Sequence, residues 1–470
     1  MRRRILWSLA ALSAASAAVL YAAPAQYLGR QEDDLLYIIA SHAIAGSGYR
    51  LFISPGQPPI TMMPGFPLLL LPVTWLAGEW YAAYQVFCAL ILAGLPWLLW
   101  RWLRRSLGEL DSVLVALLFA TSPLVLSQAG AVMSEGAYTV VAVLFLAAAE
   151  AGRWPASGGL LLALTQVRPA GFSIFPAALV RPWRERDWRA ACWSVLPALL
   201  AALVWYGWSL SAGGETGEFQ ELRLSYQGQL WLRPLAVAFD NGRYYLTAWG
   251  ASYLPLCWSS RAALAGAALA ALALRGAWRL WREERARPAI LMLAGAAVMH
   301  AFWSWQYDRY LIPLLPWLLW LTAAGAGRRA RWLLGLLLGL QLAFHSHRLL
   351  AGVADWRRPE LQRTYAWLRG HSAPSDAIAS PLYVRDGFYA RRPSVALPDT
   401  EDCGRFAQAL KRRRARFALW QKDLDVGLTL ARTATIQRKL ERARSHLEDP
   451  RRFRLAYENQ DEGSRVYELR

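Results

Sequence analysis

The chain has 470 residues, of which 56% are hydrophobic and 13% aromatic. The apolar residues gather in long blocks of Leu, Ala and Trp, which excludes an ordinary soluble domain and is typical of a polytopic membrane protein. The net charge of +19 could indicate nucleic-acid binding, but the basic clusters fall between the apolar blocks. Short basic loops beside apolar helices are the positive-inside signature, so we interpret the charge as membrane topology and expect no nucleic-acid partner.

The first apolar block, about residues 5–24, follows a basic start. A cleaved signal peptide and a retained transmembrane helix both fit this pattern. The helix agrees better with the sidedness of the later basic loops, so we expect residues 26–79 to form an outer loop.

An acidic pair, Asp33 and Asp34, lies early in this outer loop, in the stretch QEDDLLYIIASHAIAGSGYR at residues 31–50. The pattern predicts an amphipathic helix after the pair, with a Gly and Tyr49 close to its end. One interpretation is that the two acids are solvated and cap the helix, because Asp favours helix N-termini. The other is that one of them is a general base, which takes a proton from an attacking hydroxyl or amine.

The remaining apolar blocks give the topology. Residues 66–77 are too few to span the membrane and contain two prolines, so we expect an interfacial helix there. Residues 80–100 then form the second span, and the basic residues at its end lie on the cytoplasmic side. Residues 157–180 have basic residues on both sides and predict a hairpin of two short arms, while 211–245 predict a polar outer segment and 246–258 an interfacial piece. About eleven crossings are expected in total. One further single span ends near residue 151, and the others lie near 111–127, 190–210, 262–280, 288–304, 310–326 and 332–350.

Arg168 lies at the apex of the hairpin, before Pro169 and Gly171. A guanidinium inside an apolar segment costs about 2.5 to 3.5 kcal/mol on insertion scales, and such residues usually face a polar cavity. The alternative is that the side chain snorkels to the outer interface. We favour the cavity.

A second arginine of interest, Arg309, lies in SWQYDRYLIPLLPWL at residues 304–318, where Tyr307 and Tyr310 flank it. An aromatic belt with a local ion pair to Asp308 would explain this segment. A phosphate site would also explain it, because guanidinium forks match phosphate oxygens. Glu135, in MSEGAY, opens a helix at the same outer face, where acids are common without any special role.

From about residue 352 the chain is charged and its apolar runs shorten to strand length, as in AIASPLYV, FALW and VYELR. Helical patterns at 358–370 and 402–414 alternate with these runs, and FRLAYENQDEGSRVYELR predicts a closing hairpin. We therefore expect a membrane domain at 1–351 and a small extracytoplasmic α/β domain at 352–470. No Cys or His spacing suggests a metal site.

Taken together, these segments resemble membrane glycosyltransferases of the GT-C fold, in particular the family 39-type group of protein O-mannosyltransferases, aminoarabinose transferases and Rgt-type enzymes. The resemblance rests on five segments in the same order: EDDLLYIIASHAIAGSGY, PPITMMPGFPLLL, MSE at 133–135, TQVRPAG at 165–171 and DRYLIPLLP at 308–316. The second acid is often Glu in the mannosyltransferases and is Asp34 here, so their substrate does not carry over.

The resemblance implies a polyprenyl-phosphate sugar donor, a glycan, lipid or protein acceptor, and inversion at the anomeric carbon. It assigns the catalytic base to Asp33, with Asp34 as the second candidate, and the donor phosphate to Arg168 and Arg309. Glu135, Tyr310 and Tyr49 lie in the same matching segments and are expected to contact the substrates. The resemblance leaves metal dependence open, because some relatives with an acidic motif use a divalent cation and one acidic pair does not decide between the alternatives. The expected location is the inner (plasma) membrane of the cell envelope, as a multi-pass protein.

Three other functions fit parts of the sequence. A lipid or glycan transporter or flippase would also carry intramembrane arginines, but it predicts inverted repeats, which the sequence does not have. A non-catalytic envelope scaffold would not need the acidic pair or Arg168. A ligase that moves whole glycans from a lipid pyrophosphate would differ only in its donor.

Overall fold

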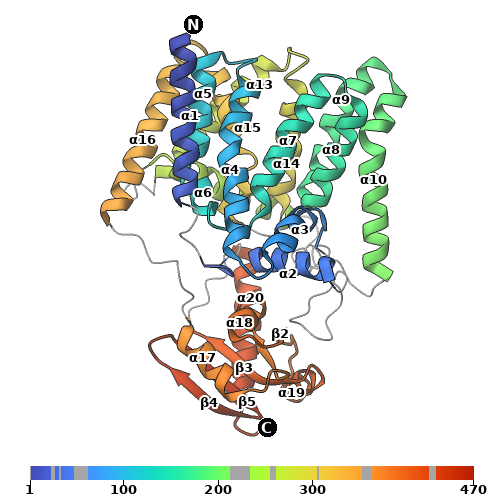
Figure 1. The fold of residues 1–470 in the computed structure, drawn as a ribbon, viewed down its shortest axis with the longest axis vertical. Helices are drawn as coiled ribbons and strands as arrows, with labels where there is room; N and C mark the ends of the chain where they lie inside the picture. Colours follow the sequence, from blue (N-terminus) through green and yellow to red (C-terminus); the bar gives the residue numbers. More distant parts are fainter. Residues whose placement is uncertain are drawn as a thin grey trace.

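The structure is a computed structural model that describes residues 2–22, 27–30, 33–46, 62–211, 233–254, 261–303, 306–351, 361–422 and 430–470. A bundle of long helices forms one part, and a small domain with a β-sheet lies at one end of the bundle (Figure 1). The N-terminus lies at the opposite end of the bundle, far from the C-terminus (Figure 1).

Most of the labelled helices of the bundle lie along the vertical axis of Figure 1. The longer helices of the bundle are α1 (Arg2–Ala22), α4 (Ala82–Leu103), α5 (Glu109–Ala120), α7 (Ser134–Glu150), α8 (Trp154–Val167), α9 (Phe175–Glu185), α10 (Trp188–Ser211), α12 (Arg233–Ala251), α13 (Ala262–Leu280), α14 (Arg287–Phe302), α15 (Leu315–Ala326) and α16 (Ala330–Ala351). Short helices join some of them: α6 (Pro123–Gln128), and the 3-10 helices η2 (Pro169–Ile174), η4 (Asp308–Leu311) and η5 (Gly327–Arg329).

Two further helices, α2 (Asp33–Gly46) and α3 (Gly65–Ala77), cross the end of the bundle that faces the small domain (Figure 1). They pack against each other, and Ser41 of α2 is joined to Thr74 of α3 by a hydrogen bond of 2.6 Å between their hydroxyls. The predicted helix after the acidic pair is therefore present, and it starts at Asp33 itself. The helix predicted at 66–77 is also present and too short to span.

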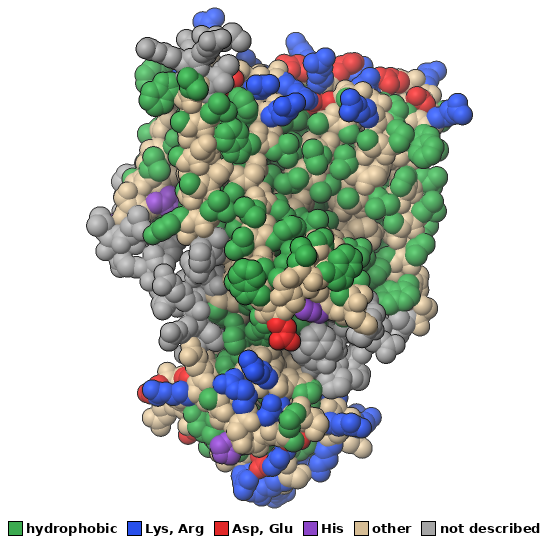
Figure 2. All heavy atoms as spheres, in the orientation of Figure 1, with side chains coloured by type: hydrophobic (Ala, Val, Ile, Leu, Met, Phe, Trp, Pro, Cys, Tyr) green, Lys and Arg blue, Asp and Glu red, His purple; other side chains and the backbone are tan. Residues whose placement is uncertain are grey.

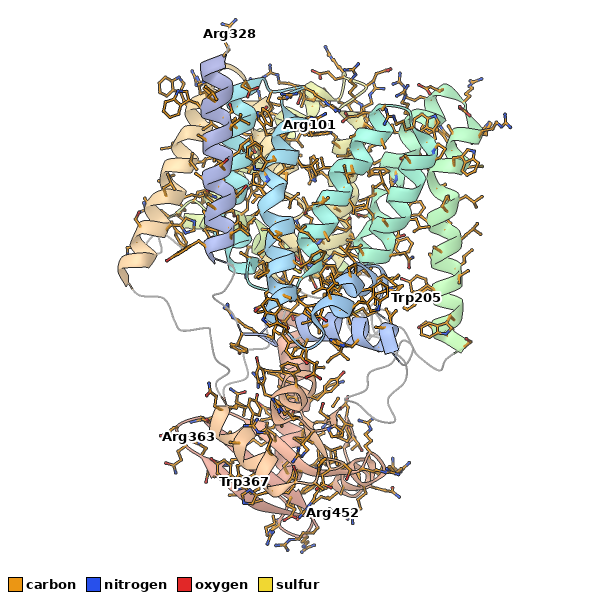
Figure 3. All side chains as sticks on the ribbon, in the orientation of Figure 1. Arg101, Trp205, Arg328, Arg363, Trp367 and Arg452 are labelled. Carbon is orange, nitrogen blue, oxygen red and sulfur yellow. The ribbon has the colours of Figure 1, made fainter. Side chains whose placement is uncertain are left out.

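The surface has the charge distribution of a membrane protein. In Figure 2 charged side chains gather at the end of the bundle away from the small domain and on the small domain itself, with a largely hydrophobic band between them. Arg101 and Arg328 lie toward the first of these ends (Figure 3), which we call the basic end. Within the described residues, three helices, α4, α10 and α13, are long and apolar enough to cross a bilayer, so the expected total of about eleven crossings stays a prediction.

Two predicted segments differ from the structure. The span expected at 111–127 is divided into α5 and α6, because Pro123 cannot continue the hydrogen-bond ladder of the helix before it. The polar segment expected at 211–245 contains the first turns of α12, so residues 233–251 are one helix. The hairpin at 157–180 agrees with α8, η2 and α9, and Arg168 lies in extended conformation between its arms.

The small domain has one five-stranded sheet with the order β2-β1-β3-β5-β4. Its strands are β1 (Ala377–Ser380), β2 (Ser394–Ala396), β3 (Ala415–Gln421), β4 (Phe453–Asn459) and β5 (Ser464–Leu469). Its helices are α17 (Gln362–His371), α18 (Tyr383–Ala390), α19 (Cys403–Arg412) and α20 (Leu430–Leu447). β1 is parallel to β2 and β3, whereas β5 is antiparallel to β3 and β4.

The predicted closing hairpin is confirmed as the β4–β5 pair. The strand expected over AIASPLYV ends at Ser380, and helix α18 begins three residues later. Helix α18 lies against α2 of the bundle, so the small domain meets the acidic loop through this helix.

Two helices of the bundle, α13 and α15, pack closely against each other. Helices α13 and α15 meet at Gly276 and Gly325, and a Cβ at Gly276 would lie 1.9 Å from the carbonyl oxygen of Leu321. Small residues at such contacts let helix backbones approach closely in membranes.

We predict that Gly276→Ala lowers the unfolding free energy by about 2 kcal/mol, because the added methyl group forces α13 and α15 apart. Gly339→Ala in α16 is the matched control, since a Cβ there meets no atom within 4 Å. Thermal unfolding of both variants in detergent measures the difference, and equal midpoints would contradict the packing argument.

Candidate active site

A cavity of about 410 Å³ opens where α2, the turn after α8, the end of α14 and η4 meet. Four of the predicted site residues line it, namely Asp33, Arg168, Arg309 and Tyr310. These residues come from three segments that are far apart in the sequence. The fold therefore brings Asp33 of the acidic pair and both arginines to one place.

Asp33 and Arg309 form a direct ion pair. The Nη2 of Arg309 lies 2.5 Å from Oδ2 of Asp33, and Nη1 of the same guanidinium lies 3.9 Å from the sulfur of Met133. The Arg309 side chain is 5% exposed, whereas the Asp33 side chain is 37% exposed. Asp33 is thus open to an incoming molecule while Arg309 forms part of the cavity wall.

Glu135 lies between the two arginines. Its Oε1 is 2.7 Å from Nη1 of Arg168 and 3.7 Å from Nε of Arg309, and the residue is 1% exposed. Glu135 is in the first turn of α7, so α7 places one carboxylate behind both guanidinium groups. Burying two cations is costly unless they are paired, and this carboxylate offsets that cost. Glu135 reaches the cavity only through the two arginines that it holds.

Hydroxyl and aromatic groups fix the orientation of the arginines. Nη1 of Arg168 donates to Oγ of Ser134 at 2.9 Å, and Ser134 is hydrogen-bonded to the Tyr37 hydroxyl at 3.2 Å. The Arg168 guanidinium lies 5.4 Å from the centre of the Tyr310 ring, and that of Arg309 lies 4.5 Å from the centre of the Tyr307 ring. Cation–π contacts of this kind favour the charged guanidinium over a ring face.

Asp34 points away from this cavity. Its carboxylate is 1% exposed and accepts hydrogen bonds from the backbone N–H of Gly29, at 2.9 and 3.0 Å, and from that of Leu35, at 2.8 Å. Burial raises the pKa of Asp34 to about 7, although the two N–H groups act in the opposite direction. Asp34 is buried and is therefore not a solvated helix cap, whereas Asp33 is ion-paired with its side chain still 37% exposed.

Helix α12 holds the segment that carries Arg309. The side-chain amide of Asn241 lies 2.9, 2.9 and 2.7 Å from the carbonyl oxygens of His300, Ala301 and Trp303, where α14 ends. The Tyr244 hydroxyl donates to Asp308 at 2.6 Å. Asp308 therefore bonds to α12, while Arg309 turns to Asp33 instead of forming a local pair with its neighbour.

Several residues that line the cavity were not predicted from the sequence. Tyr37 could have been found, because it lies one helical turn after Asp33. His300 and Tyr383 had no such signal: His300 lies inside an apolar helix and Tyr383 belongs to the small domain. Tyr49 lies outside the described residues. In the part of the chain that is described, no group of three or more His, Cys, Asp or Glu residues could hold a metal ion.

A second cavity, of about 470 Å³, lies between α12, α13, α14 and α15 and is lined almost entirely by apolar side chains. His300 lines both cavities. Its Nδ1 lies 2.6 Å from the carbonyl oxygen of Ala296, so Nδ1 carries a proton and donates to that oxygen. The charged cavity and the apolar cavity thus meet at the imidazole of His300.

No protein-family model matches this sequence, and a comparison with curated proteins finds no match either. Solved structures do resemble the fold. ArnT from Cupriavidus metallidurans bound to undecaprenyl phosphate has a TM-score of 0.60 and 12% identity, covering 98% of this chain and 97% of that one. The apo state of the same protein gives a TM-score of 0.56 at 13% identity, with the same coverage. The Archaeoglobus fulgidus oligosaccharyltransferase, in complex with zinc and sulfate, gives 0.56 at 13%, over 87% of this chain and 67% of that one.

These neighbours are glycosyltransferases of the GT-C fold, and this chain has that fold. The expected GT-C fold is thereby confirmed, whereas the number of crossings and the extracytoplasmic location of the small domain stay predictions. Identities of 12 and 13% carry nothing beyond the fold.

We predict that Glu135→Gln lowers the unfolding free energy by about 3 kcal/mol, because both buried arginines lose their shared carboxylate. Arg168→Gln should lower it as well, and the double variant should lose less than the sum of the two. The control is Glu185→Gln, whose pair with Arg181 at 2.8 Å is about half exposed on both sides. It should change stability by less than about 0.5 kcal/mol. Denaturation in detergent gives all four values, and strictly additive losses would contradict the coupling.

Proposed function

We propose that this chain is a membrane glycosyltransferase that moves a sugar from a polyprenyl-phosphate donor to an acceptor in the cell envelope. The observation that carries the proposal is that Asp33, Arg168 and Arg309 line one cavity, and that an apolar cavity adjoins it at His300. A carboxylate, two guanidinium groups and an adjoining apolar space match an acceptor, a phosphate and a lipid chain respectively. The GT-C fold, and the undecaprenyl phosphate bound to the ArnT neighbour, support the same assignment.

The two arginines hold the donor phosphate. An arginine has five N–H donors, and the contacts of Arg168 with Glu135 and Ser134 both use Nη1. The guanidinium lines the cavity, so its remaining donors can meet phosphate oxygens there. The phosphate would also compete with Asp33 for Arg309, which frees the carboxylate when the donor is bound.

The apolar cavity between α12 and α15 takes the start of the polyprenyl chain. Because His300 lines both cavities, a phosphate at the arginines and an isoprenoid unit among the apolar side chains would be contiguous. In the neutral imidazole, Nε2 of His300 can accept a hydrogen bond from a sugar hydroxyl at this junction.

The reaction that these groups support is a single displacement. Asp33 takes the proton of the acceptor hydroxyl or amine as that atom forms a bond to the anomeric carbon. The bond between this carbon and the phosphate oxygen breaks, and its electron pair leaves with the phosphate. Arg168 and Arg309 stabilise the resulting anion, so no acid is needed on the leaving side. Attack opposite the leaving group inverts the anomeric carbon.

We assign the base to Asp33 over Asp34, because Asp33 lines the cavity and Asp34 is bonded to backbone N–H groups away from it. Sidedness follows the positive-inside pattern: the basic end faces the cytoplasm, and the cavity and the small domain face the other side of the plasma membrane. The flippase alternative makes a different prediction, since it moves the lipid without breaking the bond between sugar and phosphate.

Asp33→Asn should lower the rate of sugar transfer by at least about 10²-fold, because the base is lost. Expression should stay near wild type, and lipid-phosphate binding should be at least as tight, because Arg309 loses its competing carboxylate. Asp34→Asn should retain more activity, because an amide oxygen can still accept the hydrogen bonds from Gly29 and Leu35. The measurement is release of label from a panel of radiolabelled polyprenyl-phosphate sugars by purified protein with membrane extract. Wild-type transfer by Asp33→Asn would overturn the base assignment, and no release from any donor by wild type would overturn the proposed function.

Arg168→Ala should raise the apparent donor Michaelis constant by about tenfold, because one of the two phosphate ligands is lost. The matched control is Arg184→Ala, whose guanidinium lies far along α9 in an exposed pair with Glu284. Titration with undecaprenyl phosphate measures binding apart from catalysis. Unchanged affinity in Arg168→Ala would assign this arginine to structure alone.

A further inference from the structure

The small domain makes a defined contact with the loop that carries the two aspartates. The Tyr389 hydroxyl, on α18, donates to the carbonyl oxygen of Leu28 at 2.7 Å. Tyr389 also stacks on Tyr365 of α17, with ring centres 5.6 Å apart, and meets Tyr27 edge-on at 6.4 Å. The small domain thus holds the turn at 27–30, which ends three residues before the start of α2 at Asp33.

Gly29 is the point at which this contact reaches Asp34. Its backbone N–H bonds both carboxylate oxygens of Asp34, and its φ of +88° is a conformation that favours glycine. A Cβ at Gly29 would lie 2.8 Å from Cγ of Arg385 and 2.7 Å from Cδ1 of Leu35. The aliphatic stem of Arg385 therefore packs directly on the backbone that holds Asp34.

Arg385 is itself fixed by a buried network within the small domain. It is 5% exposed and pairs with Asp386, 3% exposed, at 2.9 Å. The Tyr365 hydroxyl donates to Asp386 at 2.7 Å, and Arg385 donates to the side chain of Gln421 on β3 at 2.9 Å. A buried ion pair adds little net stability, because desolvation offsets its attraction, but it holds its members in one geometry. The network thus links the sheet of the small domain to Gly29.

The same helix also reaches the candidate active site. Tyr383, the first residue of α18, lines the cavity that contains Asp33. One helix of eight residues therefore contributes a wall residue to the cavity and packs against the turn beside Asp34.

We propose that α18 of the small domain positions the catalytic loop, and that Tyr389 and Arg385 are positioning residues for Asp33. Tyr389 is hydrogen-bonded to Leu28, and the stem of Arg385 packs on Gly29. The backbone N–H of Gly29 in turn donates to Asp34, which is the neighbour of Asp33 in the chain. This proposal rests on the proposed function for its effect on rate, but the contact itself can be measured without catalysis. The small domain then contributes to catalysis by positioning the loop that carries Asp33.

Tyr389→Phe removes one hydroxyl and keeps the ring stacking, so it tests the contact without emptying the interface. We expect kcat to fall about tenfold, because displacing a reacting group by even 1 Å can cost up to about 10²-fold. The donor Michaelis constant and binding of undecaprenyl phosphate should stay within about twofold of wild type, because Tyr389 does not belong to the residues that line the cavity with Arg168 and Arg309. Gly29→Ala should lower kcat in the same way, from the other side of the contact.

The matched control is Tyr457→Phe, on β4 of the same domain, whose hydroxyl accepts only a long bond of 3.3 Å from Asn459 among the bonds described. It should leave kcat unchanged. A merely structural role for Tyr389 would lower the thermal midpoint and leave kcat unchanged, and that result would overturn the proposal.

Hydrogen exchange separates this proposal from the proposed function. Tyr389→Phe should speed amide exchange in the peptide that covers residues 27–40, because Gly29 and Leu35 donate to Asp34 there, and Tyr457→Phe should not. Unchanged exchange in Tyr389→Phe would overturn the positioning role even if sugar transfer is confirmed. Faster exchange in a protein that transfers no sugar would support the contact and reject only the proposed function.

Discussion

The structure depends on a small cluster of buried charges. Arg309 is paired with Asp33 at 2.5 Å, and Glu135 lies between Arg309 and Arg168. Removing such charges from water is costly, and the cost is offset only while all the partners stay within reach of one another. Because α2, α7, the end of α8 and η4 each supply one member, this requirement constrains how four parts of the bundle meet.

The surroundings of the cluster show how that geometry is kept. Asn241 of α12 is hydrogen-bonded to the end of α14, and Tyr244 of α12 is hydrogen-bonded to Asp308. These bonds attach the short η4 segment to α12. The cavity that results is polar at the arginines and continues at His300 into an apolar space. A molecule with a charged group beside a long apolar chain fits this arrangement better than a fully polar or fully apolar ligand does.

The small domain belongs to the same arrangement. Its contact with the bundle is made by α18, through Tyr389 and the stem of Arg385, at the turn just before α2. Asp34 contributes to this contact by accepting backbone N–H groups, while its neighbour Asp33 faces the cavity. Adjacent residues at the start of a helix point in different directions, so two neighbouring acids can have separate roles.

The sequence by itself determined the class of protein, most of the helices and the residues worth testing. Hydropathy and charge patterns are local, so they identified the α2 and α3 helices, the hairpin with Arg168 at its apex and the closing β4–β5 pair. Tertiary structure alone decided that Asp33 meets Arg309, that Glu135 holds both arginines, and that Tyr383 from the small domain lines the cavity. Those contacts join residues more than 30 and up to several hundred positions apart, and no local pattern encodes which distant partner will compensate a buried charge.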